Sequence, residues 1–285
     1  MAFRLTLPAG VVLLSVVACD GLIGIEDRTV RDGGSTDARS PSDATIPDAA
    51  DAGSLLDAQQ DAALVDPSTL GPLEIWLDGE RGVGTSAGEV SYWQDQSNHH
   101  RDLGRGSPSL ASVRQEPFPG TGRPSILFQP ATTTTGGYLV RTGFTLPHPL
   151  TIAMAVLPTD ATVGSFDFVF AGNRVPTIGI SHYGDAFQMV AGSDATFSSL
   201  SVYKSWTAAP HVVVAVYNGS SSSLQVDSLP SQSGPLTPAP LEGLVVGGGG
   251  EMFRGYVGEL LIYGSALEEV NRAAVASYLR ARYAP

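Results

Sequence analysis

The feature that most constrains the fold is an apolar run near the C-terminus. Residues 257–263 are aliphatic, β-branched or aromatic apart from Gly258 and one charge, Glu259. This composition is typical of a strand that is covered on both faces, because a half-exposed strand alternates apolar and polar residues. Gly264 ends the run, and Ser265 precedes Glu268 by three residues, which is the pattern of a capping box at a helix start. We therefore expect a buried strand followed at once by a helix.

The predicted helix has one apolar stripe and oppositely charged ends. Apolar residues recur at the three- and four-residue spacing of one helix face, and they are Leu267, Val270, Ala274 and Tyr278. Glu268 and Glu269 lie near the start, where the helix dipole favours anions, and Arg280 and Arg282 lie near the end, where it favours cations. We expect a surface helix that closes the domain.

Short apolar segments separated by glycine and proline turns fill most of the chain before that strand. The segments read as strands are 73–79, 124–128, 150–158, 166–172, 177–183, 186–191, 211–217, 224–227 and 244–246. Asn218-Gly219 is a hairpin signal between two of them. No motif repeats at a fixed period, which argues against a propeller or a solenoid. Many short strands and one late helix predict an all-β fold, an antiparallel β-sandwich with one short C-terminal helix.

The first 18 residues have the features of a signal peptide. An apolar run spans residues 5–17, which is too short for a membrane span of about 20 residues but long enough for a signal-peptide core. The run ends in Val16-Val17-Ala18-Cys19, which resembles the lipobox of bacterial lipoproteins. That resemblance implies a lipidated Cys19 as a membrane anchor. The alternative is an ordinary secretory signal followed by a chance cysteine.

Residues 19–70 differ abruptly in composition from the rest of the chain. Residues 20–70 hold eleven Asp or Glu, three Arg and no aromatic residue. So little apolar area cannot offset the entropy of ordering, and like charges extend the chain, so we expect a disordered tether. The sequence thus divides into 1–18, a signal peptide; 19–70, an acidic linker; and 71–285, one domain. The formal net charge of −12 argues against a nucleic-acid partner, because Lys and Arg supply most of that affinity.

Two blocks resemble the laminin-G-like jelly rolls of the concanavalin A-like lectin/glucanase superfamily. The C-terminal block matches at Gly255, Val257, Glu259, Leu260, Ile262, Tyr263, Ala266 and Leu267. The N-terminal block matches at Val90, Trp93, Asp95, Ser97 and Asn98. Gly258 departs from the usual Asp, and Asn98-His99-His100 replaces the more frequent Gly-Asn-Gly. The resemblance implies a jelly roll of the concanavalin A-like type.

The resemblance also suggests residues for a metal and for a ligand. Related families bind Ca²⁺ through oxygen ligands at one end of the sandwich, and the candidates here are Asp78, Asp95 and Asn98. For Asp95, a turn in which the carboxylate caps its own backbone is the favoured alternative. Sugar-binding proteins use aromatic rings beside amide groups, which suggests Tyr138, Asn173, Tyr183 and Trp206 as ligand-binding residues. Packing in the core is the alternative for each of them.

An enzyme is the less favoured interpretation. Glu74, Asp78 and Glu80 share strand parity, but Glu74 and Asp78 would lie about 13 Å apart, beyond the roughly 5 Å of a retaining glycosidase. No nucleophile turn is present around any serine. We therefore expect no catalytic residues and a lipid-anchored binding or adhesion module of the cell envelope, for glycan or protein ligands. The alternatives are a glycosidase of the same superfamily and a purely structural envelope lipoprotein.

Overall fold

The computed structural model describes most of the predicted domain. The described residues are 65–106, 113–129, 137–159, 167–173, 177–183, 186–192, 197–203, 209–248 and 251–284. The predicted signal peptide, Cys19 and nearly all of the predicted linker lie outside them. Among the described residues, no helix has both the length and the apolar character to cross a membrane.

Eight strands form the first sheet. They are β1 (Leu73–Asp78), β5 (Val113–Pro117), β6 (Pro124–Phe128), β8 (Leu150–Pro158), β13 (His211–Tyr217), β14 (Ser222–Val226), β15 (Gln232–Gly234) and β18 (Gly255–Tyr263). Their order is β15-β14-β13-β8-β18-β6-β5, and β1 also pairs with β18. The predicted closing strand is therefore central, because β18 pairs with β1, β6 and β8.

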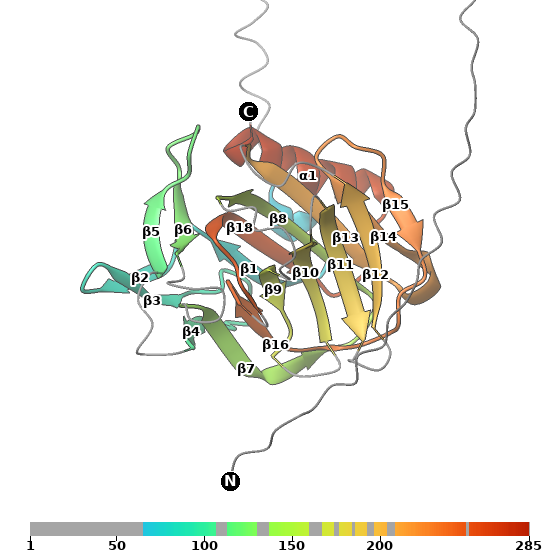
Figure 1. The fold of residues 1–285 in the computed structure, drawn as a ribbon, viewed down its shortest axis with the longest axis horizontal. Coiled ribbons are helices and arrows are strands. Elements are labelled where there is room, and N and C mark those ends of the chain that lie inside the picture. The colour runs from blue at the N-terminus through green and yellow to red at the C-terminus, as the bar shows by residue number, and fades with distance from the viewer. Residues whose placement is uncertain are drawn as a thin grey trace, which may run out of the picture. The chain divides into compact units, whose positions relative to one another are not determined.

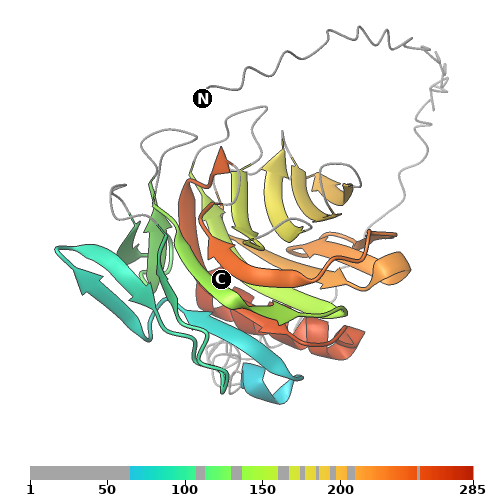
Figure 2. The same cartoon turned by 90° about the horizontal axis from the view of Figure 1, so that it is seen from below.

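Ten strands form the second sheet. They are β2 (Val83–Ser86), β3 (Glu89–Trp93), β4 (Leu103–Arg105), β7 (Leu139–Leu146), β9 (Asp167–Ala171), β10 (Thr177–Tyr183), β11 (Ala186–Gly192), β12 (Ser198–Tyr203), β16 (Leu241–Val246) and β17 (Glu251–Met252). Their order is β12-β11-β10-β9-β16-β7-β4-β3-β2, and the short β17 pairs in parallel with β9. The other pairs are antiparallel, as predicted. Figure 1 labels these strands, and Figure 2 shows the curvature of the two layers.

The eight-stranded sheet is covered on both faces. On β13, Val213 and Ala215 belong to the main core between the sheets, whereas Val212 and Val214 belong to a second apolar cluster. That second cluster includes Val275 and other residues of the helix α1 (Glu269–Tyr283). Because successive side chains point to opposite faces, residues 212–216 of β13 are apolar on both faces, and all seven residues of the strand are buried.

These observations confirm the predicted fold class. The chain forms an all-β, two-sheet antiparallel sandwich with one C-terminal helix. Every residue from Val257 to Tyr263 is buried, as the sequence predicted. The predicted hairpin at residues 218–219 is present as well, since β13 and β14 pair across the 3-10 turn Gly219–Ser221. A second 3-10 turn, Pro67–Thr69, precedes β1.

The predicted capping box is wrong. The helix begins at Glu269, and its N-cap residue Glu268 makes no side-chain capping hydrogen bond. Instead the Thr151 hydroxyl of β8 donates to the carbonyl of Ser265 at 2.8 Å and accepts from the amide of Leu267 at 2.9 Å. The residues between β18 and α1 are thus bound to β8. Because of these two hydrogen bonds, the helix begins later in the sequence than the capping-box pattern predicts.

The predicted apolar stripe is confirmed at Leu267, Ala274 and Tyr278, which belong to or pack against the second apolar cluster, but not at Val270. Val270 is 68% exposed, and Leu267 is buried but precedes the helix. The buried positions of α1 are Val275, Ala276, Tyr278, Leu279, Arg282 and Tyr283. A buried arginine was not expected in that set, because sequence reasoning had assigned Arg282 to a simple interaction with the helix dipole.

Candidate functional site

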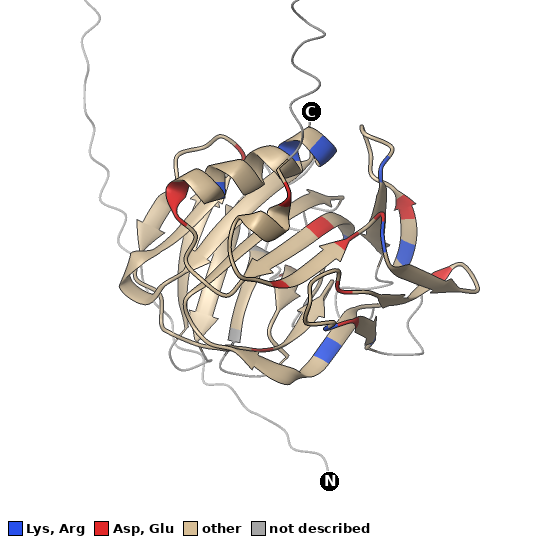
Figure 3. Cartoon of the chain, turned by 180° about the vertical axis from the view of Figure 1, so that it is seen from behind, with Lys and Arg blue, Asp and Glu red and all other residues tan. Residues whose placement is uncertain are grey.

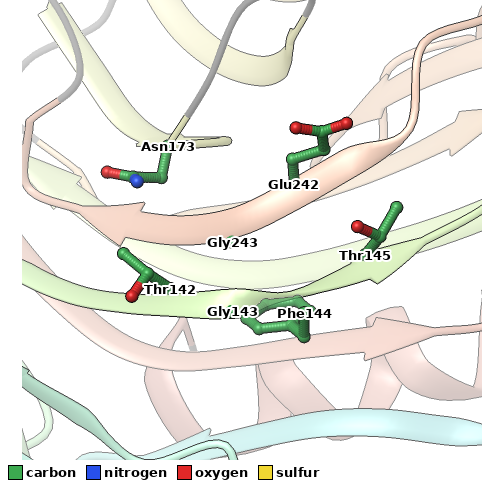
Figure 4. Close-up of a pocket in the computed structure, with 7 residues that line it drawn as sticks. All are labelled: Thr142, Gly143, Phe144, Thr145, Asn173, Glu242 and Gly243. Atoms are coloured by element: carbon green, nitrogen blue, oxygen red, sulfur yellow. The ribbon is translucent and has the colours of Figure 1, made fainter.

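An open cavity lies on the outer face of the ten-stranded sheet. Its volume is about 280 Å³, and Figure 4 shows its lining residues, which are Thr142, Gly143, Phe144, Thr145, Asn173, Glu242 and Gly243. Thr145 of β7 and Glu242 of β16 are cross-strand partners. The neighbouring pair, Leu146 and Leu241, belongs to the main core. Since adjacent positions on a strand point to opposite faces, Thr145 and Glu242 project outward.

A break in strand register forms this cavity. The pairing of β16 with β7 shifts between Glu242 and Leu244, so that residues 142–144 of β7 lie opposite Gly243 alone. Both glycines in this segment have left-handed backbones, with φ of +82° at Gly143 and +65° at Gly243. Extra residues of this kind bend a strand and redirect its side chains, and such irregularities are frequent at functional sites.

Gly243 also allows a close approach by Asn173. A Cβ atom at position 243 would lie 3.0 Å from the Cβ of Asn173 and 2.8 Å from the carbonyl oxygen of Arg141. The backbone amide of Asn173 donates to the carbonyl of Glu242 at 2.8 Å. This bond fixes the segment after β9 against β16. The amide side chain of Asn173 is thereby placed at the rim of the cavity, where it is exposed.

The polar side chains of the cavity have no partner in the described part of the structure. Among the described residues, no hydrogen-bond or ion-pair partner is found for the side chains of Thr142, Thr145, Asn173 and Glu242. Phe144 adds a half-buried ring that packs against the core, with the guanidinium carbon of Arg101 5.0 Å from the ring centroid. The cavity therefore offers a carboxylate, an amide and two hydroxyls above an apolar base. This set of groups suits a neutral ligand with many hydroxyls.

Of the four predicted ligand residues, the structure brings only Asn173 to this cavity. Tyr138 immediately precedes β7, and its ring packs against Gly106, where an added Cβ would lie 1.8 Å from the ring. Tyr183 is the last residue of β10, but its side chain lies outside the described part of the structure. Trp206 lies outside the described residues altogether. Sequence reasoning missed Thr142 and Thr145 because β7 carries no apolar alternation in its middle. It missed Glu242 because this residue precedes the segment read as a strand, 244–246, on β16.

The three predicted metal ligands are not arranged as a cation site. Both oxygens of Asp95 accept hydrogen bonds, from the amides of Trp76, Ser97 and Arg101 and from the Ser97 hydroxyl. The oxygens of Asp78 accept from the amide of Glu80 and from two arginines, Arg81 and Arg282. Asn98 is exposed and lines a separate cavity. In the described residues, no three His, Cys, Asp or Glu side chains cluster as cation ligands would.

That separate cavity, of about 480 Å³, lies beside β1. Trp76, Asn98 and His99 are among its lining residues. The indole N–H of Trp76 donates to Glu259 at 2.6 Å, and the guanidinium carbon of Arg81 lies 4.4 Å from the centroid of its ring. Trp76 is therefore already engaged by two partners, which leaves less of its ring for a ligand than the position of the cavity suggests.

The three carboxylates that share strand parity, Glu74, Asp78 and Glu80, form ion pairs with arginines. Glu74 pairs with Arg101 at 2.8 Å. Glu80 pairs with Arg123 at 2.6 Å and with Arg282 at 3.2 Å. Arg282 also binds Asp78 at 3.1 Å. Each of these three carboxylates thus takes part in an ion pair within the protein.

Arg282 belongs to a buried cluster, which we call the closure cluster: Asp78, Glu259, Tyr278 and Arg282. Tyr278 donates its hydroxyl to Glu259 at 2.9 Å and accepts from Arg282 at 2.8 Å. Glu259 and Asp78 are fully buried. Burial raises the pKa of Glu259 to about 7, against the opposing effect of Arg282, and the nearby Asp78 raises it further. The cluster joins β1 to β18 and α1, which follow it by more than 170 residues in the sequence.

Comparisons with known proteins identify the fold. No family model matches the chain, and no curated protein matches it. The chain is similar to the binding domain of botulinum neurotoxin serotype C1, with a TM-score of 0.57 and 8% identity over 75% of this chain and 53% of that one. It is also similar to botulinum neurotoxin type C, whose cell entry depends on two ganglioside molecules, with a TM-score of 0.56, 8% identity and the same coverage.

A third similar structure is Trypanosoma rangeli sialidase in complex with sialic acid. Its TM-score is 0.50, with 14% identity over 73% of this chain and 33% of that one. The chain therefore spans about half the length of the toxin domains and a third of the sialidase. At such low identity the likeness is one of fold: a jelly-roll β-sandwich of the concanavalin A-like type.

Proposed function

We propose that residues 71–285 form a non-catalytic, laminin-G-like binding module for glycan ligands. The observation that carries the proposal is the cavity on the outer face of the ten-stranded sheet, where Phe144 and four polar side chains without a partner among the described residues form the lining. Support also comes from the fold, since proteins of similar structure are described with gangliosides and with sialic acid. Because these proteins are only 8% and 14% identical to this chain, the support they give concerns the fold.

The chemistry of the cavity fits a sugar better than an apolar ligand. Glu242 would accept hydrogen bonds from two neighbouring sugar hydroxyls, and Asn173 would both donate and accept. Thr142 and Thr145 would add hydroxyl contacts at the opposite wall. The left-handed glycines Gly143 and Gly243 carry no side chains, so a ring could approach the backbone closely.

The absence of catalysis is part of the proposal. Glycosidases of the usual kind need two carboxyl groups, about 5 to 9.5 Å apart, on either side of the bond that is cleaved. Glu242 is the one acidic residue among those that line the cavity. The carboxylates of Glu74, Asp78 and Glu80 are paired with arginines, as described above. A single carboxylate is sufficient for binding but not for this reaction.

The location of the module is also proposed. Lipidation of Cys19 would anchor the chain to a membrane of the cell envelope, because several acyl chains give stable attachment. The acidic residues 20–70 would then act as a spacer between membrane and domain. Replacing Cys19 with Ser tests this directly: the variant should move from the detergent phase to the aqueous phase, and an unchanged partition would rule out the anchor.

A glycan array with the chain from residue 19 onward, carrying Cys19→Ser, tests the binding function. We expect retention of a small set of glycans and at least about tenfold weaker binding after Glu242→Gln, because one charge-assisted hydrogen bond becomes neutral. Glu116→Gln, on β5 of the other sheet, is the matched control and should bind as wild type. Equal losses in the two variants, or no retained glycan, would contradict the proposal; the second outcome would favour a structural envelope protein.

A further inference from the structure

A polar groove runs between α1 and the outer face of the eight-stranded sheet. Its volume is about 250 Å³. Its polar lining includes Ser223, Gln225 and Ser231 on the side of the sheet and Arg272, Ser277 and Arg280 on the helix. Figure 3 shows the helix across this face of the sheet, with arginine segments in blue. The groove is separate from the proposed glycan cavity, which lies on the ten-stranded sheet.

The helix sequence explains why a groove exists here. Positions 269, 272, 273, 277 and 280 recur on one face of a helix, so their side chains form a stripe. Ala273 and Ser277 lie in the middle of that stripe, and their side chains are too short to reach the sheet. Space therefore remains between the two longer arginine side chains.

Arg280 has a donor that the protein leaves unused. One of its terminal nitrogens, Nη2, donates to the carbonyl of Asp227 at 3.2 Å. Its Nε–H is buried, and no acceptor for it is found among the described residues. A buried N–H of a charged group without an acceptor is costly, and most such groups in proteins are satisfied. An acceptor supplied from outside would remove that cost.

Among the described residues, no carboxylate forms an ion pair with Arg280. The carboxylate of Asp227 accepts from the amide of Val212 at 2.9 Å and pairs with His211 at 2.9 Å. Glu269 lines the opposite end of the groove, eleven residues before Arg280 and so about 16 Å away along the helix axis. In the described part of the structure, the guanidinium of Arg280 is therefore not paired with a carboxylate.

The polar side chains beside Arg280 form weak hydrogen bonds within the protein. Gln225 donates to the carbonyl of Leu229 at 3.4 Å, and Ser231 donates to the carbonyl of Leu224 at 3.4 Å. Hydrogen bonds of that length are weak, so a ligand oxygen could replace them. Ser277 is exposed and adds a further hydroxyl.

We propose that this groove is a second binding site, specific for an oxyanion: a sulfate, phosphate or carboxylate group. Arg280 provides the principal contact through its Nε–H, and Ser231, Gln225 and Ser277 donate to the remaining oxygens. Arg272 adds positive charge farther along the groove. The site does not depend on the glycan cavity, so either can exist without the other.

Calorimetric titration of the Cys19→Ser chain with sodium sulfate, phosphate or acetate, at constant ionic strength, tests the site. We expect saturable binding of at least one anion. Arg280→Gln should weaken it at least about tenfold, through loss of a charge-assisted hydrogen bond, and Ser277→Ala should weaken it by a smaller factor. Arg114→Gln, an exposed arginine on β5, removes the same charge elsewhere and should leave binding unchanged. Thermal melts of each variant verify that the domain remains folded.

Two results would overturn the proposal. One is the absence of saturable binding to the wild-type chain with all three anions. The other is an equal loss in Arg280→Gln and Arg114→Gln, which would indicate diffuse attraction to positive charge. A sulfated oligosaccharide and its unsulfated form then show whether the anion is carried on a sugar: Arg280→Gln should affect only the sulfated form. Glu242→Gln should leave anion binding unchanged, which separates this site from the glycan cavity.

Discussion

Glu259 of β18 and Arg282 of α1 form an ion pair inside the protein, with Oε2 and Nε 3.2 Å apart. Glu259 is fully buried, and Arg282 is 9% exposed. The pair connects a central strand of the eight-stranded sheet to the last turn of the helix. Removing two charges from water is costly, so such a pair is favourable only when further hydrogen bonds satisfy both partners. Trp76 and Tyr278 supply these bonds to Glu259.

Arg282→Met should destabilise the domain strongly. The substitution leaves Glu259 buried without its cation, whereas Asp78 keeps Arg81. Removal of one partner of a buried pair costs about 3–5 kcal/mol. Urea unfolding followed by tryptophan fluorescence measures the effect. Arg114→Met, at an exposed position, should change stability by less than about 0.5 kcal/mol. Similar midpoints for the two variants would show that the closure cluster contributes little.

Stability should fall as the pH rises from about 5 to 8. Burial raises the pKa of Glu259 from 4.5 to about 7, so the folded state binds this proton more tightly than the unfolded state. The resulting stabilisation is present below about pH 4.5 and is lost as the pH passes through about 7, with a size on the order of 3 kcal/mol. Glu259→Gln cannot titrate, and its unfolding free energy should vary less over this range. An unchanged pH profile in Glu259→Gln would assign the effect to other groups.

Gly243→Ala should both destabilise the domain and weaken binding in the glycan cavity. The backbone at Gly243 is left-handed, and the new Cβ would lie 2.8 Å from the carbonyl oxygen of Arg141. We expect a cost of about 1–3 kcal/mol from the strained backbone, together with displacement of Asn173. Gly104→Ala on β4 is the control, since nothing lies within 4 Å of its added Cβ. Chemical denaturation and glycan binding are the two measurements.

Gly258→Ala tests the position where the resembled family usually has Asp. An added Cβ would lie 2.5 Å from the ring of Tyr283, whose hydroxyl donates to the carbonyl of Gly258 at 3.0 Å. Overpacking of this kind typically costs about 1–3 kcal/mol. The double variant with Tyr283→Leu should lose less stability than the sum of the single variants, because the clash is removed. If the stability losses of the two single variants simply add in the double variant, a clash with Tyr283 is not the reason for glycine at position 258.

Thr151→Val should cost more stability than Ser265→Ala. The Thr151 hydroxyl connects Ser265 and Leu267, and its loss leaves a backbone carbonyl and a backbone amide without their partner, which costs about 1–3 kcal/mol. A capping-box serine would cost about 1 kcal/mol when replaced by alanine, but here no capping bond is present, so we expect almost no change. Thermal unfolding of both variants distinguishes the two arrangements.

Much of the fold could be predicted from the sequence. The closing strand, the hairpin at residues 218–219 and the antiparallel sandwich were all predicted, because periodicity and turn residues act over a few positions. Strands such as β7 were missed, since a break in register and two glycines interrupt their alternation. The helix start was misplaced because Thr151, which lies 114 residues before Ser265, holds the segment before it.

The candidate sites were much less accessible to sequence reasoning. Asn173 was named for its chemistry, but Glu242 and the two threonines gave no signal, because only the pairing of β7 with β16 and the approach of the segment after β9 bring them together. The sequence by itself determined the local elements and the class of fold. Tertiary structure alone decided which polar groups meet and which acids are buried, because those contacts join residues far apart in the chain and depend on how two curved sheets and a helix pack.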